Sequence, residues 1–306
     1  MPYLNTARAI RNMIAEYTQA STLWIDTEVA DYNSRNPRLS LIQVLDHPDD
    51  MSGDRVFLLD VLNQDELVAD FIQQVMLNPN VEKVFHNASY DVKFLGNKKA
   101  KNITCTLEIA KKIPYYLLPV PNYQLKTLAT VLCNFHDIDK QSQSSDWSRR
   151  PLSEEQIDYA YLDCIYLAQV HKCLLELQAE GNPEPDTEDL IALNARYTQI
   201  EEQWKLLNSE YEHLQERIKK AMQAQNVSET SAFKLTAYER KTVKAQFLEL
   251  ARLVQTQGLD LDFPITLTQK LQKDLGENLE QLSVEIDTSN ALRLTPKTQE
   301  TNGEDE

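Results

Sequence analysis

The chain has 306 residues, of which 42% are hydrophobic, and a formal net charge of −16 at pH 7. This length accommodates one large domain or two smaller ones, and the apolar content is sufficient for a packed core. The acidic balance argues against a protein that coats nucleic acid, because such proteins carry basic surfaces. It does not argue against a local nucleic-acid site, because the charge near a site matters more than the total.

The sequence lacks the features typical of membrane, secreted, zinc-binding, disulfide-rich and nucleotide-binding proteins. No apolar run approaches the ~18 residues of a membrane span, and no apolar core of a signal peptide follows the first residues, so we expect a cytoplasmic protein with no membrane partner. The four cysteines are widely spaced, which favours reduced structural thiols over a zinc site or a disulfide framework. The six scattered glycines form neither a dinucleotide-binding motif nor a P-loop.

Predicted strands and helices follow one another over the first 180 residues. Thr6 is suited to cap a helix over 7–17. Apolar runs predict strands at 23–29, 39–45, 56–61 and 81–85. Helical spacing predicts helices at 65–76, 88–95, 125–133 and 153–180, and a mixed strand and helix segment at 104–113. Three early strands followed by this alternation predict an α/β fold with a mixed sheet flanked by helices.

A break at Gly181-Asn182-Pro183-Glu184-Pro185 separates this part from the rest, so we predict a first domain over 1–181. A heptad follows, with apolar residues three and four apart at Leu190, Leu193, Tyr197, Ile200, Trp204, Leu207, Tyr211, Leu214, Ile218 and Ala221. It predicts a coiled coil or a paired long helix of about 48 Å. Because aromatic residues share one seam position, pairing with the final segment and self-association both stay open.

The final segment predicts helices at 241–254 and 266–275 and a short strand at 291–294. We therefore expect residues 182–296 to form a long-helix or coiled-coil α+β accessory module. Residues 297–306 are polar and charged, and we expect a disordered acidic tail.

Two acidic residues follow an apolar lead-in in the strand predicted at 23–29. Asp26 and Glu28 are two positions apart, so both side chains leave the same face of the strand. Paired carboxylates repel each other unless a cation lies between them. Many acidic proteins contain such a pair, and its position at the end of an apolar strand is what makes this one a candidate metal site.

Two further motifs place a carboxylate one helical turn from a polar residue. Asn87 is expected to cap the helix over 88–95, with Asp91 one turn inside it. Tyr159 and Asp163 are also four residues apart, on one face of the long helix. Taken alone, the first motif is better explained as a capped helix with a solvated aspartate, and the second as a core tyrosine with an exposed aspartate. In the order D-x-E, D, Y-x-x-x-D they predict a site of oxygen ligands for a hard divalent cation.

This order resembles that of the DEDDy 3′–5′ exonucleases, and a fourth segment is more specific. Residues 139–153 read DKQSQSSDWSRRPLS and are similar to the segment before the third motif of the ribonuclease D family, close to D-K-x-x-Q-x-S-D-W-S-x-R-P-L. Residues 40–43, SLIQ, resemble the L-x-L-I-Q strand of that family. The resemblance covers about residues 1–180 and implies a ribonuclease H-like fold.

The resemblance also implies roles for particular residues. Four carboxylates would hold two Mg²⁺ or Mn²⁺ ions: Asp26, Glu28, Asp91 and Asp163. Tyr159 would assist the water that attacks the scissile phosphate. A second group would border the terminal nucleotide or the substrate path: Gln43, His86, Asn87, Lys140, Trp147, Arg149 and Arg150. Within this group Arg149 is the better candidate than Lys140 for a phosphate contact, because a guanidinium binds phosphate bidentately. Trp147 either stacks a base or packs in the core.

These implications predict a metal-dependent exonuclease that acts on the 3′ ends of single-stranded RNA or DNA, with RNA favoured, and releases nucleoside 5′-monophosphates by a two-metal-ion mechanism. The alternative is a catalytically weak nucleic-acid-binding or scaffold protein that acts through its coiled coil. The complete carboxylate set disfavours that alternative, and turnover would discriminate between the two. The segment 146–150 disfavours a metal-dependent phosphatase. Residues 190–221 would contact a second copy of the chain or another protein.

Overall fold

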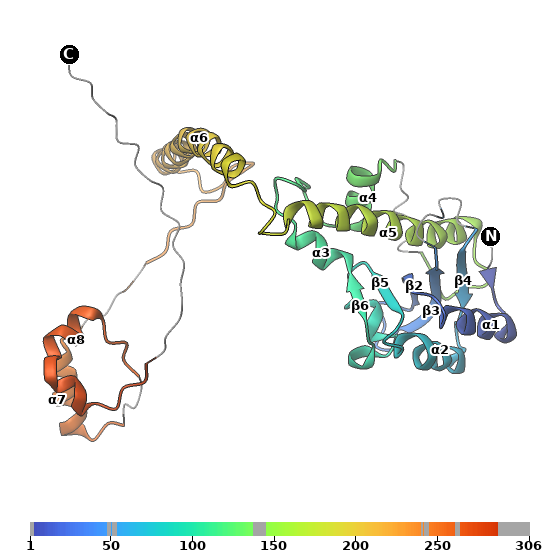
Figure 1. Ribbon diagram of the computed structural model, residues 1–306, viewed down its shortest axis with the longest axis horizontal. Coiled ribbons are helices and arrows are strands. Elements are labelled where there is room, and N and C mark those ends of the chain that lie inside the picture. The colour runs from blue at the N-terminus through green and yellow to red at the C-terminus, as the bar shows by residue number, and fades with distance from the viewer. Residues whose placement is uncertain are drawn as a thin grey trace, which may run out of the picture. The chain divides into compact units, whose positions relative to one another are not determined.

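The computed structural model describes residues 3–47, 50, 54–136, 145–239, 241, 245–260 and 264–286 (Figure 1). The chain divides into two compact units, Met1–Leu207 and Asn208–Glu306, and the division falls within one long helix. None of the helices in these ranges is both long and apolar enough to cross a membrane.

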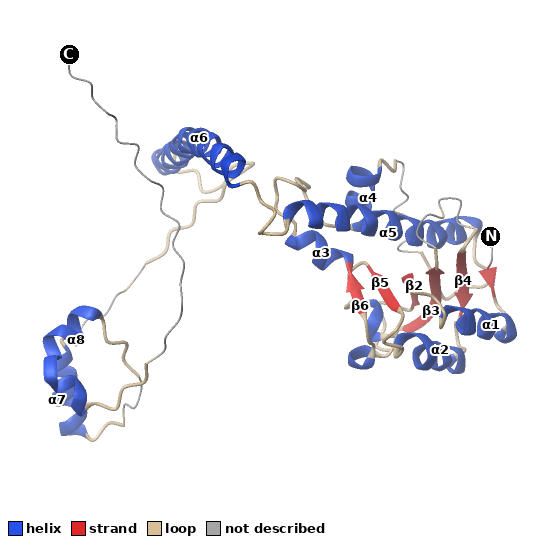
Figure 2. Cartoon of the chain, viewed as in Figure 1, coloured by secondary structure: helices blue, strands red, loops and turns tan. Residues whose placement is uncertain are grey.

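A six-stranded mixed sheet forms the centre of the first unit (Figure 2). Its order is β1 (Tyr3–Leu4), β4 (Val56–Asp60), β3 (Arg38–Leu45), β2 (Thr22–Ala30), β5 (Glu82–Phe85) and β6 (Ile103–Cys105). Strand β3 is antiparallel to both neighbours, and the other pairings are parallel. The predicted mixed sheet of a ribonuclease H-like domain is confirmed, and only the two-residue β1 was not predicted.

The helices of this unit begin and end close to their predicted positions. They are α1 (Ala7–Tyr17), α2 (Asp65–Phe71), α3 (Thr106–Lys112), α4 (Leu125–Cys133) and α5 (Glu154–Gly181). Thr6 caps α1 as predicted, because its hydroxyl accepts a hydrogen bond from the backbone N–H of Ala9 at 3.4 Å. Helix α2 continues as a π-helical turn, η1 (Ile72–Met76), so the predicted helix over 65–76 is confirmed.

Alternation of side chains along the strands gives the sheet two apolar faces. Leu23 and Ile25 of β2 lie on the face that packs against α1 and α2. Trp24 lies on the opposite face, where it packs with residues of α5 such as Cys164. Helices therefore cover both faces of the sheet (Figure 2). By the same alternation, Asp26 and Glu28 lie on the face covered by α5.

The start of α5 is fixed by a reciprocal pair of hydrogen bonds. The Ser153 hydroxyl accepts from the backbone N–H of Gln156 at 3.2 Å, and the Gln156 side chain accepts from the backbone N–H of Ser153 at 3.1 Å. This capping box satisfies two N–H groups that the first turn leaves without partners. The Gln156 amide also donates to the Ser145 hydroxyl at 2.9 Å, which attaches the preceding segment to the helix.

The prediction of a helix over 88–95 is wrong. The segment contains one 3-10 turn, η2 (Asp91–Lys93), and a second, η3 (Asn97–Lys99), follows it. An N-cap residue has an extended backbone, whereas Asn87 has a φ of 60°, so it does not cap a helix. Gly96, with a φ of 94°, interrupts the helical backbone again after η2.

In the described residues of the C-terminal part, the named elements after α5 are all helices or helical turns. It contains α6 (Leu190–Ala224), α7 (Phe247–Gln257), α8 (Gln269–Leu275) and the 3-10 turn η5 (Gly276–Gln281). The long helix predicted from the heptad is confirmed, and the helix predicted over 241–254 begins later, at Phe247. The strand predicted at 291–294 and the tail at 297–306 lie outside the described residues. The domain limits at 181 and 296 stay predictions.

Candidate metal centre

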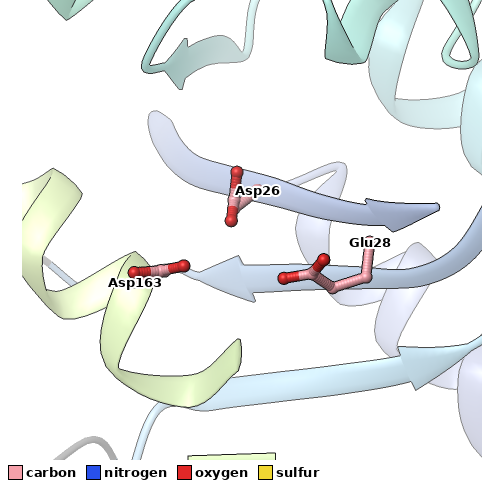
Figure 3. Close-up of side chains that lie close together, drawn as sticks. All are labelled: Asp26, Glu28 and Asp163. Carbon is pink, nitrogen blue, oxygen red and sulfur yellow. The ribbon is translucent and has the colours of Figure 1, made fainter. Parts of the chain in front are cut away.

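Three carboxylates from two elements meet on the sheet face covered by α5 (Figure 3). Asp26 and Glu28 of β2 and Asp163 of α5 each offer a carboxylate oxygen, and these oxygens lie within 4.8 Å of one another. The pair on β2 was predicted at the end of the strand. The strand in fact continues to Ala30, so the pair lies inside it, just before a register irregularity at Val29.

Burial and mutual repulsion make these carboxylates reluctant to ionise without a counter-ion. Burial raises the pKa of Asp26 to about 6. The pKa of Glu28 is raised first by burial and then by Asp26, Asp163 and Asp91, and that of Asp163 by burial and by Asp26. Hard divalent cations take such oxygen ligands, and a cation relieves the repulsion. The donor set therefore fits a divalent metal ion.

Asp91 lies beside this group but is not part of it. Its side chain is 3% exposed at the start of η2, and the Thr27 hydroxyl donates a hydrogen bond to its Oδ1 at 2.5 Å. Burial, and then the Asp26 charge, raise the pKa of Asp91 to about 8. Three of the four predicted ligands thus lie together, and the fourth is near enough for its charge to raise the pKa of Glu28. Nothing in the sequence pointed to the contact with Thr27.

Tyr159 lies one helical turn before Asp163, as its spacing predicted. Its hydroxyl donates a hydrogen bond to the Asp163 carboxylate, and burial together with the neighbouring carboxylates raises the pKa of Tyr159 well above its usual range. The phenol therefore stays protonated at neutral pH and remains a donor at the edge of the acidic group.

Trp147 belongs to the core. Its side chain is 2% exposed in the cluster between the sheet and α5, and its ring lies 6.3 Å from the Tyr159 ring, centroid to centroid. A ring buried in this way cannot stack on a nucleotide base. Of the two alternatives for this residue, the structure supports packing and not base stacking.

Arg150, which was predicted to border the substrate path, is bound by groups of the protein itself. Its guanidinium donates from Nε and Nη2 to the two carboxylate oxygens of Asp60 at 2.6 and 2.7 Å, and from Nη2 to the Ser40 hydroxyl at 2.9 Å. Tyr3 donates a further hydrogen bond to Asp60. The Arg150 guanidinium is thus held by protein groups and ties the segment before α5 to β3 and β4. Its Nη1 also donates to the Trp147 carbonyl at 3.1 Å. Since the Trp147 ring lies beside the Tyr159 ring, Arg150 is connected through Trp147 to Tyr159.

The neighbouring Arg149 has the opposite setting. Its side chain is 82% exposed and forms an ion pair with Asp146 at 2.9 Å. An exposed pair of this kind exchanges readily with solvent, so the guanidinium is accessible to a phosphate. Lys140, the remaining predicted cation, lies outside the described residues.

Three predicted nucleotide contacts lie at the ends of strands or within the sheet. His86 is partly buried, with Nδ1 2.9 Å from the Thr106 hydroxyl, and burial lowers its pKa to about 4, so the ring is neutral. Gln43 is fully buried in register with Asp26, and among the described residues its amide atoms have no hydrogen-bond partner. Asn87 is exposed. Of the three, Asn87 alone presents an exposed side chain in this structure.

Comparison with known proteins gives a consistent match over the first unit. The family model described as 3′–5′ exonuclease matches residues 2–178. Ribonuclease D of Bartonella henselae is 33% identical over 55% of this chain and 39% of its own length, and Protein RRP6-like 3 of Arabidopsis thaliana is 28% identical over 60% and 20%. The crystal structure of Escherichia coli RNase D aligns with a TM-score of 0.47 and 20% identity, over 58% of this chain and 45% of that one. The chain thus spans less than half the length of the relatives named here.

Proposed function

Because the chain belongs to the 3′–5′ exonuclease family, we propose that it hydrolyses phosphodiester bonds at the 3′ end of single-stranded nucleic acid and releases nucleoside 5′-monophosphates. The observation that carries this proposal is the meeting of Asp26, Glu28 and Asp163 within 4.8 Å. A buried group of this composition has an evident use in holding cations and no evident use in packing.

The residues that would hold the cofactor are Asp26, Glu28 and Asp163, with Asp91 at the side of the group, and the cofactor would be two Mg²⁺ or Mn²⁺ ions. When bound, such ions neutralise charge on the phosphate and lower the pKa of a nucleophilic water. The hydrogen bond from Thr27 holds the Asp91 carboxylate in one orientation, and an oriented ligand is favourable for a metal site.

Tyr159 would position the attacking water. It stays protonated because its pKa is raised, so its hydroxyl is a donor and, through its lone pairs, an acceptor. The hydrogen bond to Asp163 keeps this hydroxyl beside the acidic group. Arg149, which is accessible, would contact a phosphate of the substrate.

We favour RNA as the substrate, because several of the relatives are named ribonuclease D. Single-stranded DNA is the competing substrate in the experiment. The sugar preference would follow from the ratio of the two cleavage rates under one set of conditions.

The test is a time course on RNA and DNA oligonucleotides of one sequence, labelled at either end, with Mg²⁺, Mn²⁺ or EDTA. The expected result is a ladder that shortens from the 3′ end and disappears with EDTA and in Asp26→Asn. Shortening from the 5′ end would overturn the polarity. Absence of cleavage with every metal would favour the alternative of a binding or scaffold protein that acts through α6.

A further inference from the structure

Helix α6 carries an exposed apolar stripe along one side. We call this stripe the α6 seam, and it consists of Leu190, Leu193, Tyr197, Ile200, Trp204, Leu207, Tyr211 and Leu214. These side chains are between 43% and 70% exposed. Scattered apolar residues are normal on a protein surface, but a contiguous stripe of this kind marks an interaction surface.

We propose that the α6 seam binds the α6 seam of a second copy of this chain, in an antiparallel coiled coil whose two-fold axis passes beside Gln203. The proposal is independent of the catalytic function. It rests on the shapes and charges along one continuous helix, Leu190–Ala224.

The sizes of the seam residues favour the antiparallel arrangement. A parallel pair would place Tyr197, Trp204 and Tyr211 each against its own copy, because equivalent seam positions face each other in parallel dimers. In the antiparallel pair each aromatic residue faces an aliphatic one. Trp204 then lies against Ile200 of the partner subunit, Tyr197 against Leu207 of the partner subunit, and Tyr211 against Leu193 of the partner subunit. Large and small side chains alternate across the interface, which close packing requires.

The charges beside the seam favour the same arrangement, and such flanking charges set the orientation of coiled coils. On one flank, Arg196 faces Glu210 of the partner subunit, and this contact occurs twice because of the two-fold axis. Asp189, which also caps α6 through the N–H of Ile191 at 2.9 Å, faces Arg217 of the partner subunit, again twice.

The other flank contains one like-charge contact, between Glu201 and its own copy. Lys205 lies in the same helix and pairs with Glu201 at 3.3 Å, which reduces the repulsion. In a parallel pair, Arg196 would face Glu201 of the partner subunit, while Glu210 would face the uncharged Gln215 of the partner subunit. The parallel arrangement therefore has fewer opposite-charge contacts than the antiparallel one.

In a dimer of this kind the two chains enter the paired helices from opposite ends. Leu190 lies opposite Leu214 of the partner subunit, so the two points at which the chain enters α6 are separated along the axis by about 36 Å.

Charge reversal in the full-length protein tests the orientation. Sedimentation equilibrium would be measured for Arg196→Glu, for Glu210→Arg and for the double variant. We expect each single variant to weaken dimerisation at least about tenfold, because like charges then face each other at two contacts, and the double variant to restore it. A Glu210→Arg variant that dimerises like the wild type would overturn the antiparallel arrangement, because only in that arrangement does Glu210 face a charge. A wild-type protein that stays monomeric up to about 100 μM, a weak affinity for a specific interface, would overturn the interface itself.

A pair of cysteine variants provides a second readout. Gln203→Cys lies beside the proposed two-fold axis, so it should form a disulfide-linked dimer under mild oxidation, whereas Leu207→Cys should not, because it faces Tyr197 of the partner subunit. The wild type, with its four native cysteines, is the background control. The opposite pattern, with Leu207→Cys cross-linked and Gln203→Cys not, would indicate a parallel pair and overturn the proposal. Failure of both to cross-link in a protein that sediments as a dimer would place the interface elsewhere and overturn it as well.

Discussion

The two longest helices of this chain, α5 and α6, differ in what surrounds them. Helix α5 has 28 residues, and its buried side chains contact the sheet on one side and α3 and α4 on the other. Helix α6 has 35 residues, and its apolar seam is exposed along its length. A helix with apolar residues on several sides is held by its own domain, whereas a helix with one narrow stripe needs a second helix.

This difference explains which helix carries the candidate site. In the proposed function, Tyr159 and Asp163 would have to keep their positions relative to β2 to within a fraction of an ångström. The sheet, the capping box at Ser153 and the tie through Arg150 to Asp60 hold α5 in place. Only a helix restrained on several sides can present a carboxylate with that precision.

The largest effect is expected from a substitution that removes the carboxylate that α5 contributes to the acidic group. Asp163→Asn should lower the rate of hydrolysis about a thousandfold, because metal ions stabilise the transition state by several kcal/mol. The midpoint of thermal unfolding in EDTA should not fall, because a neutral amide avoids the burial cost and the repulsion that raise the pKa of Asp163. The exposed Glu176→Gln on the same helix is the control and should keep full activity. Full activity in Asp163→Asn would show that the site is assigned wrongly.

A matched pair of truncations measures the difference between the helices directly. Leu174→Ala in α5 removes a fully buried side chain and should lower the free energy of unfolding by about 3 kcal/mol. Leu207→Ala in α6 removes a side chain that is 64% exposed and should leave that free energy unchanged in dilute protein, while weakening self-association. Urea unfolding at low protein concentration makes the comparison. Equal losses would mean that Leu207 is covered within a single chain.

The two neighbouring arginines before α5 are expected to have different roles, Arg150 in stability and Arg149 in substrate binding. Arg150→Met should lower the free energy of unfolding by about 2 kcal/mol, because the Asp60 carboxylate loses charge-assisted hydrogen bonds. Arg149→Met, at an exposed position, should leave unfolding unchanged and raise the KM for the oligonucleotide. Urea unfolding and steady-state kinetics on both variants provide the test. An unchanged KM in Arg149→Met would remove this residue from the substrate path.

The last expected effect is a pH dependence of stability that arises at the acidic group. The pKa of Asp91 is raised to about 8 in the folded protein, so the folded state keeps a proton that the unfolded state releases. The stability of the metal-free protein should therefore fall as pH rises from about 4, the pKa of a free aspartate, to about 8. Asp91→Asn should reduce this slope in thermal unfolding between pH 5 and 9 with EDTA. Identical slopes in the two proteins would exclude Asp91 as the source.

Local patterns in the sequence predicted most of the strands and helices of the first domain. The strands at 23–29 and 39–45 were predicted from apolar runs, and the helix from Ser153 begins with the capping box that the structure contains. The helix over 88–95 was predicted wrongly. Its apolar spacing is helical, but Asn87 adopts a left-handed backbone, which the apolar pattern does not reveal.

The residues of the acidic group were predictable because their chemistry and order are properties of the chain. Asp26, Glu28 and Asp163 were named before any contact was known, and they lie together. The side chains around them were not predictable in the same way. Arg149 and Arg150 are adjacent in the same sequence motif. Yet Arg150 is bound by Asp60, 90 residues away, and Arg149 is exposed.

The sequence by itself determined which carboxylates belong to the candidate metal centre and where the two long helices begin. The tertiary structure alone decided which neighbours serve the site and which serve the core. Trp147 is buried against Tyr159, and Asp91 is held by Thr27, 64 residues away. Burial and hydrogen bonding join segments that are distant in the chain, and local sequence patterns do not record those contacts.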